Sequence, residues 1–147
     1  AVEIGGFVPG FTMNPPAEQL DELATKQTAF IVELASKRPM LREVGPTVER
    51  LAPGLYEVRF AIINDGFMPT TTIMARRARA VPPTVVRMKL PVEQIVSGEP
   101  MAQSWGIDGS GGRFEHHWII RVEDGREVEI EIANVQHGSK TIRFRAE

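Results

Sequence analysis

The sequence predicts a mainly β protein, an antiparallel β-sandwich of the immunoglobulin or transthyretin kind, with one long helix near its amino terminus. Three observations lead to this prediction. A single stretch with helical spacing of apolar residues lies before residue 40. After it, about seven short stretches alternate between apolar and polar residues. Pro, Gly, Asn and Asp separate these stretches at a spacing that is typical of sandwiches.

The helix is expected over residues 16–38. It should begin at or just after Pro16, because the residue before a proline avoids helical backbone angles. Acidic residues near its start and basic residues near its end suit the helix dipole. Pro39 ends it. The apolar stripe consists of Leu20, Leu23, Ala24, Ile31, Leu34 and Ala35, with Phe30 beside it.

The next segments are expected to be mostly strands. Pro53-Gly54 predicts a type II turn between a strand at residues 47–51 and a strand at residues 56–63. The second strand places Tyr56, Val58, Phe60 and Ile62 on one face. In chain order, residues 72–80 fit a helix or a strand, 84–90 a strand, 91–100 mostly a loop, and 101–107 a strand.

The carboxy-terminal part alternates most regularly. Residues 113–123 place Phe114, His116, Trp118, Ile120 and Val122 on one face. Asp124-Gly125 then predicts a hairpin. Strands at residues 127–133 and 140–146 should pair antiparallel, with Ile130, Ile132, Ile142 and Phe144 facing the core. Glu127, Glu129 and Glu131 should then face basic residues from the set Lys140, Arg143 and Arg145.

Composition limits the classes of function. The chain has 147 residues, 42% of them hydrophobic, which is enough for a domain with a real core. The net charge of −2 gives no electrostatic reason to expect nucleic acid or a membrane surface as a partner. No apolar run is long enough to span a bilayer. The absence of Cys excludes disulfides and thiolate chemistry.

The three histidines do not have the spacing of a zinc site. His116 and His117 are adjacent in a predicted strand, so their side chains should point to opposite faces. His116 is interpreted as a packed residue and His117 as a solvated one. His137 lies in the loop before Gly138. Zinc requires about four convergent ligands, or a helical motif such as His-Glu-x-x-His, and neither occurs.

Three other features have a structural interpretation. The glycine-rich run at residues 106–113 joins two predicted strands, so a hairpin tip is favoured over a phosphate-binding loop. The basic run at residues 75–79 is interpreted as a solvated edge. Trp105 and Trp118 are interpreted as core or edge residues, with a carbohydrate-stacking platform as the open alternative.

Three stretches together resemble one family. The first stretch runs from Val2-Glu3-Ile4-Gly5-Gly6 to Asn14-Pro15-Pro16. The second is the helix, and the third is residues 54–70 together with residues 85–90 that follow them. In combination they resemble the carboxy-terminal part of bacterial zinc carboxypeptidases of the carboxypeptidase A type. The most specific parts are the two motifs before the helix and the run Asn64-Asp65-Gly66-Phe67-Met68-Pro69-Thr70. Residues 113–133 are similar in pattern only.

The resemblance implies a division of the chain. Residues 1–40 would be the terminal strand and helix of a catalytic domain, and residues 41–147 an accessory β-sandwich domain. By position, Glu3 matches the catalytic glutamate, the general base that activates zinc-bound water in the family. The family's zinc ligands and its carboxylate-binding Arg lie upstream of the strand that Val2-Glu3-Ile4 resembles. The resemblance therefore implies an inactive fragment of a parent that binds zinc and hydrolyses peptides from their carboxy termini.

Alternatives from other classes remain open at this stage. The sandwich could be a binding module for a protein or a glycan, or a purely structural domain that supports a catalytic domain. Val2-Glu3-Ile4 reads as a strand already under way, so the expected partner is an upstream domain of the same polypeptide. The apolar stripe of the helix needs cover, so a homodimer of the fragment or a docked helix is also expected.

Overall fold

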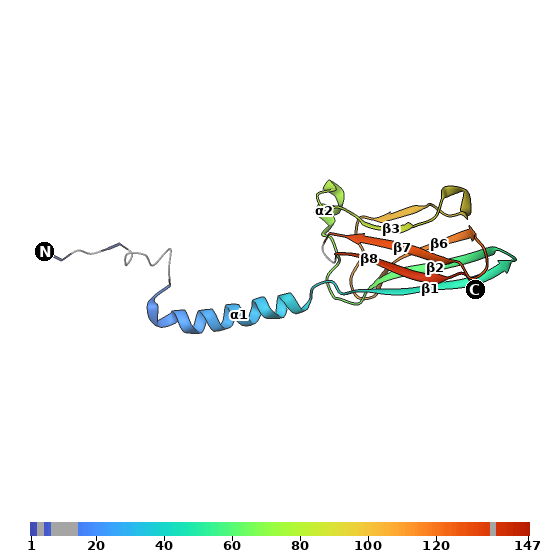
Figure 1. Cartoon of the computed structure of the whole chain (residues 1–147). Coiled ribbons are helices and arrows are strands. Elements are labelled where there is room, and N and C mark those ends of the chain that lie inside the picture. The colour runs from blue at the N-terminus through green and yellow to red at the C-terminus, as the bar shows by residue number, and fades with distance from the viewer. Residues whose placement is uncertain (3–4, 7–14, 136–137) are drawn as a thin grey trace. The chain divides into compact units, whose positions relative to one another are not determined.

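The structure, a computed structural model, describes residues 1–2, 5–6, 15–135 and 138–147. The chain divides into two units, Ala1–Lys37 and Arg38–Glu147, and each is described by itself (Figure 1). Within the described residues, no helix is both long enough and apolar enough to cross a membrane.

The first unit consists of a short 3-10 turn, η1 (Ala17–Gln19), that runs into helix α1 (Leu20–Ser36). Both lie within the helix predicted at residues 16–38. No residue of α1 is buried, and Phe30, Ile31 and Val32 are each more than 60% exposed. Within the described residues of the first unit, the apolar residues of the helix therefore have little cover.

The second unit is a sandwich of two antiparallel four-stranded sheets, which confirms the predicted fold class. One sheet has the strand order β1-β2-β6-β4 and the other has the order β5-β3-β7-β8. The strands are β1 (Leu41–Ala52), β2 (Leu55–Asn64), β3 (Thr84–Met88), β4 (Ile95–Ser97), β5 (Met101–Ser104), β6 (Gly112–Arg121), β7 (Glu127–Asn134) and β8 (Gly138–Arg145). The short elements are α2 (Ile73–Ala78) and η2 (Val92–Gln94).

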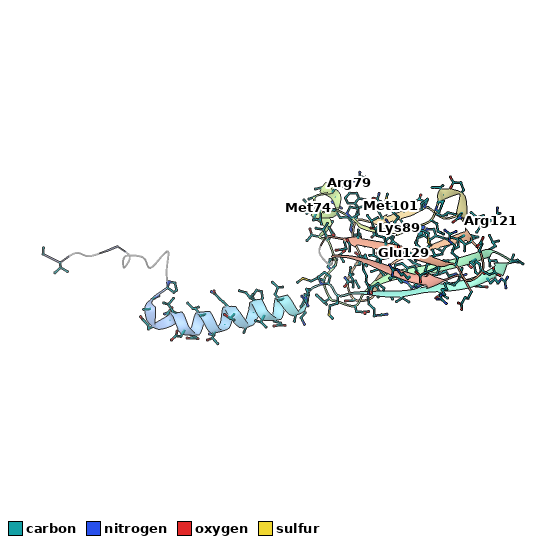
Figure 2. All side chains as sticks on the ribbon, viewed as in Figure 1. Met74, Arg79, Lys89, Met101, Arg121 and Glu129 are labelled. Atoms are coloured by element: carbon teal, nitrogen blue, oxygen red, sulfur yellow. The ribbon has the colours of Figure 1, made fainter. Side chains whose placement is uncertain are left out.

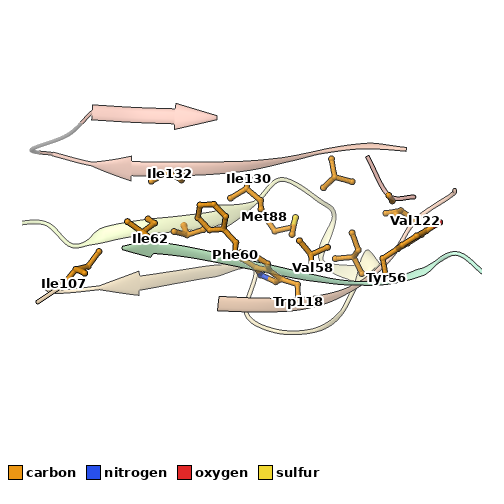
Figure 3. Close-up of a cluster of buried hydrophobic side chains, with 14 residues drawn as sticks. Tyr56, Val58, Phe60, Ile62, Met88, Ile107, Trp118, Val122, Ile130 and Ile132 are labelled. Carbon is orange, nitrogen blue, oxygen red and sulfur yellow. The ribbon is translucent and has the colours of Figure 1, made fainter. Parts of the chain in front are cut away.

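The core lies between the two sheets (Figure 3). β2 and β6 supply one wall, with Trp118 fully buried beside Val58, its partner in the ladder. β3 and β7 supply the other wall, including Met88 and Ile130. The residues predicted on the inner faces of β2 and β7 are buried, as are Trp118 and Ile120 on β6. Phe114 and His116 on β6 and Ile142 and Phe144 on the edge strand β8 are half-buried.

The outer face of the second sheet carries ion pairs close to those expected from sequence. Arg143 Nε lies 2.8 Å from Glu129 Oε1, its ladder partner. Glu131 lies opposite Thr141 instead of a basic residue, and its carboxylate pairs with Lys89 on the other side at 2.8 Å. Lys140 points to the inner side of β8 and pairs with Glu43 of β1 at 3.1 Å, which links the two sheets at their open edge.

Two predicted hairpins are wrong. Asp124-Gly125 joins β6 to β7, and residues 106–113 lead from β5 into β6, but in each case the two strands belong to different sheets. Both segments therefore cross over the core instead of closing a ladder. Residues 72–80, whose sequence fitted a helix or a strand, contain helix α2. Residues 91–100, which were expected to be mostly loop, also contain η2 and β4.

Asp124 explains why the chain crosses from β6 in one sheet to β7 in the other. Its carboxylate accepts a hydrogen bond from the buried Tyr56 hydroxyl at 2.5 Å and from the Gly54 backbone N–H at 3.2 Å, and it pairs with Arg50 at 2.5 Å. The residue therefore bonds to the β1–β2 hairpin and not to a local turn partner. The Tyr56 hydrogen bond holds the pKa of Asp124 below its ordinary value, and the same bond raises the pKa of Tyr56.

Asp124→Asn is expected to destabilise the sandwich most at neutral pH. The lowered pKa of Asp124 contributes stability above its unfolded value, near 3.8, and this stability is lost as pH falls through the folded value. The raised pKa of Tyr56 contributes stability that is lost as pH rises through its folded value. Urea unfolding measured from pH 2 to pH 11 should therefore show that the difference in free energy of unfolding between wild type and variant becomes smaller at both extremes of pH. Glu93→Gln, an exposed control, should show no such profile; a pH-independent deficit for Asp124→Asn would contradict the assignment.

Candidate functional site

Of the three histidines, the structure describes His116 and His117. The half-buried His116 packs edge-on against Trp118, with ring centroids 4.6 Å apart, and burial lowers the pKa of His116. The carbonyl of Glu99 lies 3.3 Å from His116 Nε2 and accepts a hydrogen bond from Trp118 Nε1 at 2.7 Å. His117 is exposed. Glu3 and His137 lie outside the described residues, and among the described residues no group of three or more His, Cys, Asp or Glu could hold a metal.

Neither tryptophan is fully exposed. Trp118 is completely buried in the core. Trp105 is half-buried, and the guanidinium of Arg79 lies 5.2 Å from its ring centroid. A cation at this distance is attracted by the ring face, so the face is occupied. The carbohydrate platform that the sequence left open therefore has no support in the described residues.

A polar network outside the strand ladders lies where the chain enters the sandwich. Its centre is Asn64, the last residue of β2, which is completely buried. Asn64 Oδ1 accepts hydrogen bonds from the backbone N–H of Met40 at 2.9 Å and of Gly66 at 3.1 Å. Its Nδ2 donates to the carbonyl of Met68 at 2.8 Å. One side chain thus fixes both the incoming chain and the loop that follows β2.

Residues 64–70, here called the junction loop, are fixed further by backbone bonds. The N–H of Asp65 donates to the carbonyl of Met40 at 2.9 Å, and the Asp65 carboxylate pairs with Arg42 at 2.6 Å. This pairing lowers the pKa of Asp65. At the other end, Thr70 and Ile107 exchange two hydrogen bonds at 2.8 and 2.9 Å, one of which uses the Thr70 hydroxyl as acceptor.

Two glycines are required by close approach. A Cβ atom on Gly66 would collide with the carbonyl oxygen of Arg38, and one on Gly109 would collide with the carbonyl oxygen of Phe67. The N–H groups of Ser110 and Gly111 donate to the carbonyls of Gly66 and Asn64 at 2.7 and 2.8 Å. The glycine-rich run therefore packs backbone to backbone against the junction loop.

Helix α2 is attached to the same glycine-rich run. Arg76 pairs with Asp108 at 2.8 Å, and Arg79 stacks on Trp105. The Thr72 hydroxyl caps the helix by accepting from the Ala75 N–H at 3.2 Å. Arg77 and Arg79 are exposed, as expected for a solvated edge, whereas Arg76 is half-buried against the sandwich, and the apolar residues Ile73 and Met74 are exposed.

A second surface feature is a shallow hollow of about 220 Å³ on the outer face of the β1-β2-β6-β4 sheet. It lies where the β1 register shifts between Val44 and Thr47, above Ala61. Its two cations, Arg59 and Arg113, already pair with Glu57 and Glu115 at 3.0 and 3.2 Å. The hollow therefore shows no surplus charge that would select a ligand.

The sequence indicated that the junction loop is distinctive, but not what it does. Residues 64–70 were singled out by the family resemblance, without a structural role. The role of Asn64 depends on the N–H of Met40, which is 24 residues away in the chain, so no local pattern could reveal it.

Asn64→Ala is expected to lower the free energy of unfolding by about 1–3 kcal/mol, the typical cost of leaving buried donors without acceptors. Amide exchange at Gly66 and Met40 should accelerate, because both N–H groups lose their acceptor. Gln103→Ala, which removes an exposed amide from β5, serves as the control and should change stability by less than about 0.5 kcal/mol. Equal effects of the two substitutions would show that Asn64 does not hold the junction.

Comparison with known proteins gives a family for the sandwich but no activity. No curated protein matches the chain. A family model described as a domain of unknown function, DUF8731, matches residues 41–145, which spans all eight strands apart from residues outside the described ranges. Since this match covers most of the chain, the protein belongs to the DUF8731 family.

Proposed function

We propose that the chain is the carboxy-terminal part of a zinc carboxypeptidase of the carboxypeptidase A type, with residues 41–147 as its accessory β-domain. The parent would hydrolyse carboxy-terminal residues from peptides. The sandwich itself would be non-catalytic and would serve to hold the catalytic domain. Residues 1–40 would complete that catalytic domain with its last strand and helix.

The observation that carries the proposal is the construction of the junction loop. The run that resembles the carboxypeptidases most specifically, residues 64–70, is the segment that binds the incoming chain at Met40. A motif that fixes a domain junction is expected where one domain must be held to another. The exposed apolar residues of α1 agree with a helix that packs on a sheet of the preceding domain.

The residues described here do not fit a zinc ion. Catalytic zinc sites use about three protein ligands around an open position. His116 and His117 lie on opposite faces of β6, one packed against Trp118 and the other exposed. The proposal therefore assigns zinc to the preceding polypeptide and derives no catalytic step from the sandwich.

The binding-module alternative receives less support. A glycan platform requires an exposed aromatic face, but Trp118 is buried and Arg79 covers one face of the half-buried Trp105. The hollow on the first sheet has internally paired charges. The described surface therefore favours an accessory role over recognition of a free ligand.

The full-length gene product is expected to contain zinc and to release carboxy-terminal amino acids from a short peptide. Glu3→Gln should reduce kcat by roughly 10²–10⁴-fold, the usual contribution of a general base, with zinc content unchanged. Glu18→Gln removes an exposed carboxylate at the start of the helix and should leave kcat unchanged. The 147-residue chain alone should neither bind zinc tightly nor cleave the peptide. A full-length protein without zinc, or normal turnover by Glu3→Gln, would refute the assignment.

The 147-residue chain, separated from the proposed catalytic domain, is expected to dimerise or to dock its own helix. Each large apolar side chain gains about 1.5–3 kcal/mol on full burial, so exposed Ile31 and Leu34 favour association. Light scattering with and without Ile31→Ser/Leu34→Ser, together with amide exchange along α1, measures this. Glu33→Ser, on the same helix, is the control. A monomer whose helix amides exchange rapidly would contradict both expectations.

A further inference from the structure

We propose that Asp108 is a site of spontaneous covalent modification, at which the aspartyl residue isomerises to isoaspartate through its peptide bond to Gly109. The inference does not depend on the proposed peptidase, because it uses only groups of the sandwich. The modified residue carries a free α-carboxylate on a β-linked peptide, and this is the class of substrate that an isoaspartyl methyltransferase recognises.

The reaction joins groups of two neighbouring residues. The backbone nitrogen of Gly109 loses its proton and attacks Cγ of the Asp108 carboxyl group, and one carboxyl oxygen leaves as water. The product is a five-membered succinimide ring. A water molecule then opens the ring at the former main-chain carbonyl, so that the chain continues through Cγ. One water leaves and one enters, so the mass is unchanged and neither an oxidant nor a reductant is required.

The sequence offers several places for this reaction. It contains three Asp-Gly pairs, at residues 65–66, 108–109 and 124–125, and no Asn-Gly pair. A glycine in the second position has no Cβ that would hinder the attacking nitrogen. In an unfolded chain the three pairs should therefore react at similar rates, and the fold must decide which of them reacts first.

In two of the pairs the attacking nitrogen is engaged in a hydrogen bond. The N–H of Gly66 donates to Asn64 Oδ1 at 3.1 Å, and the N–H of Gly125 donates to the carbonyl of Ala146 at 2.7 Å. Each bond must break before the nitrogen can lose its proton and attack. Asn64 and Ala146 are both buried, so breaking either bond leaves a polar group without a partner, which is costly.

The carboxylates of the same two pairs are also held. Both carboxylate oxygens of Asp65 accept hydrogen bonds from Arg42, at 2.6 and 3.1 Å. Asp124 accepts a hydrogen bond from the buried Tyr56 at 2.5 Å. These bonds hold the pKa of Asp65 and the pKa of Asp124 below their ordinary values. The protonated carboxyl group, which loses water most readily, is therefore rarer at both positions.

The peptide group between Asp108 and Gly109 has no such restraint. Neither the carbonyl of Asp108 nor the N–H of Gly109 makes a hydrogen bond with any residue that the structure describes. The anchors of the glycine-rich run lie on either side of it. Ile107 bonds to Thr70 through both its N–H and its carbonyl, and the N–H of Ser110 bonds to the junction loop. The peptide group that must rotate for ring closure is therefore unbound.

The side chain of Asp108 is open to solvent. It is 76% exposed, and its Oδ1 pairs with Arg76 at 2.8 Å. Arg76 belongs to α2, the helix on which Figure 2 labels Met74 and Arg79. Among the described residues Oδ2 of Asp108 has no partner, so this oxygen can leave as water without breaking a contact. Solvent also reaches the position at which the ring must be hydrolysed.

The 147-residue chain is incubated at mildly acidic pH, both folded and in urea, and is then digested with trypsin. The three Asp-Gly pairs fall into separate peptides, residues 60–76, 90–113 and 122–126, and Asp108 is the single Asp of the second. Isoaspartate is measured in each peptide by methylation with an isoaspartyl methyltransferase and by a change of retention at constant mass. Asp108→Glu is the matched control, because Glu would have to close a six-membered ring.

In the folded chain, isoaspartate should accumulate in residues 90–113 roughly tenfold or more faster than in the other two peptides, a factor that one hydrogen bond to the nitrogen supplies. In urea the three rates should be similar, and Asp108→Glu should abolish the signal in residues 90–113. Similar rates in the folded chain, or faster reaction at Asp65 or Asp124, would overturn the inference. It would also be overturned if residues 90–113 react in urea and not in the folded chain, because the fold would then protect Asp108 as well.

Discussion

The arrangement of the sandwich depends on a buried amide that must satisfy its hydrogen bonds. Asn64 ends β2, the strand that pairs with β1 on one side and β6 on the other. Its side chain is completely buried and bonds to the backbone of Met40, Gly66 and Met68. Buried polar groups without partners are costly, and this cost forces the chain on both sides of Asn64 into one conformation. At the other end of β2, Tyr56 has a similar role through Asp124.

These two polar anchors explain how the sheets are connected. The segment at Asp124 carries the chain from β6 to β7, and the glycine-rich run carries it from β5 to β6. Both crossings pass over an end of β2 and are held there, one by the Tyr56 hydroxyl and the other by backbone bonds to Asn64 and Gly66. The apolar core supplies most of the driving force for folding, but it is not directional. The anchors decide where each crossing lies.

The sequence predicted the elements well because alternation reports burial directly. The faces of β2, β6 and β7 follow from period-two patterns, and the core contains them. Connections were predicted less well. Asp124-Gly125 has the chemistry of a hairpin turn, yet turn chemistry does not state which sheet the next strand joins, and a partner 68 residues away, Tyr56, decides it. Lys140 was expected beside a neighbouring Glu on β7, but the side on which it lies brings it to Glu43 across the sandwich.

At the junction loop and α2, a backbone fixed by hydrogen bonds and ion pairs carries exposed apolar side chains. Polar and cationic groups, including Asn64 and Arg76, face inward at this end, whereas Phe67 and Met74 face outward. This is the reverse of the usual distribution, in which apolar groups are buried. The inward polar groups bond to residues distant in the chain, Asn64 to Met40 and Arg76 to Asp108, although the buried Nε of Arg76 has no partner among the described residues. The exposed apolar groups take no part in the core of the sandwich.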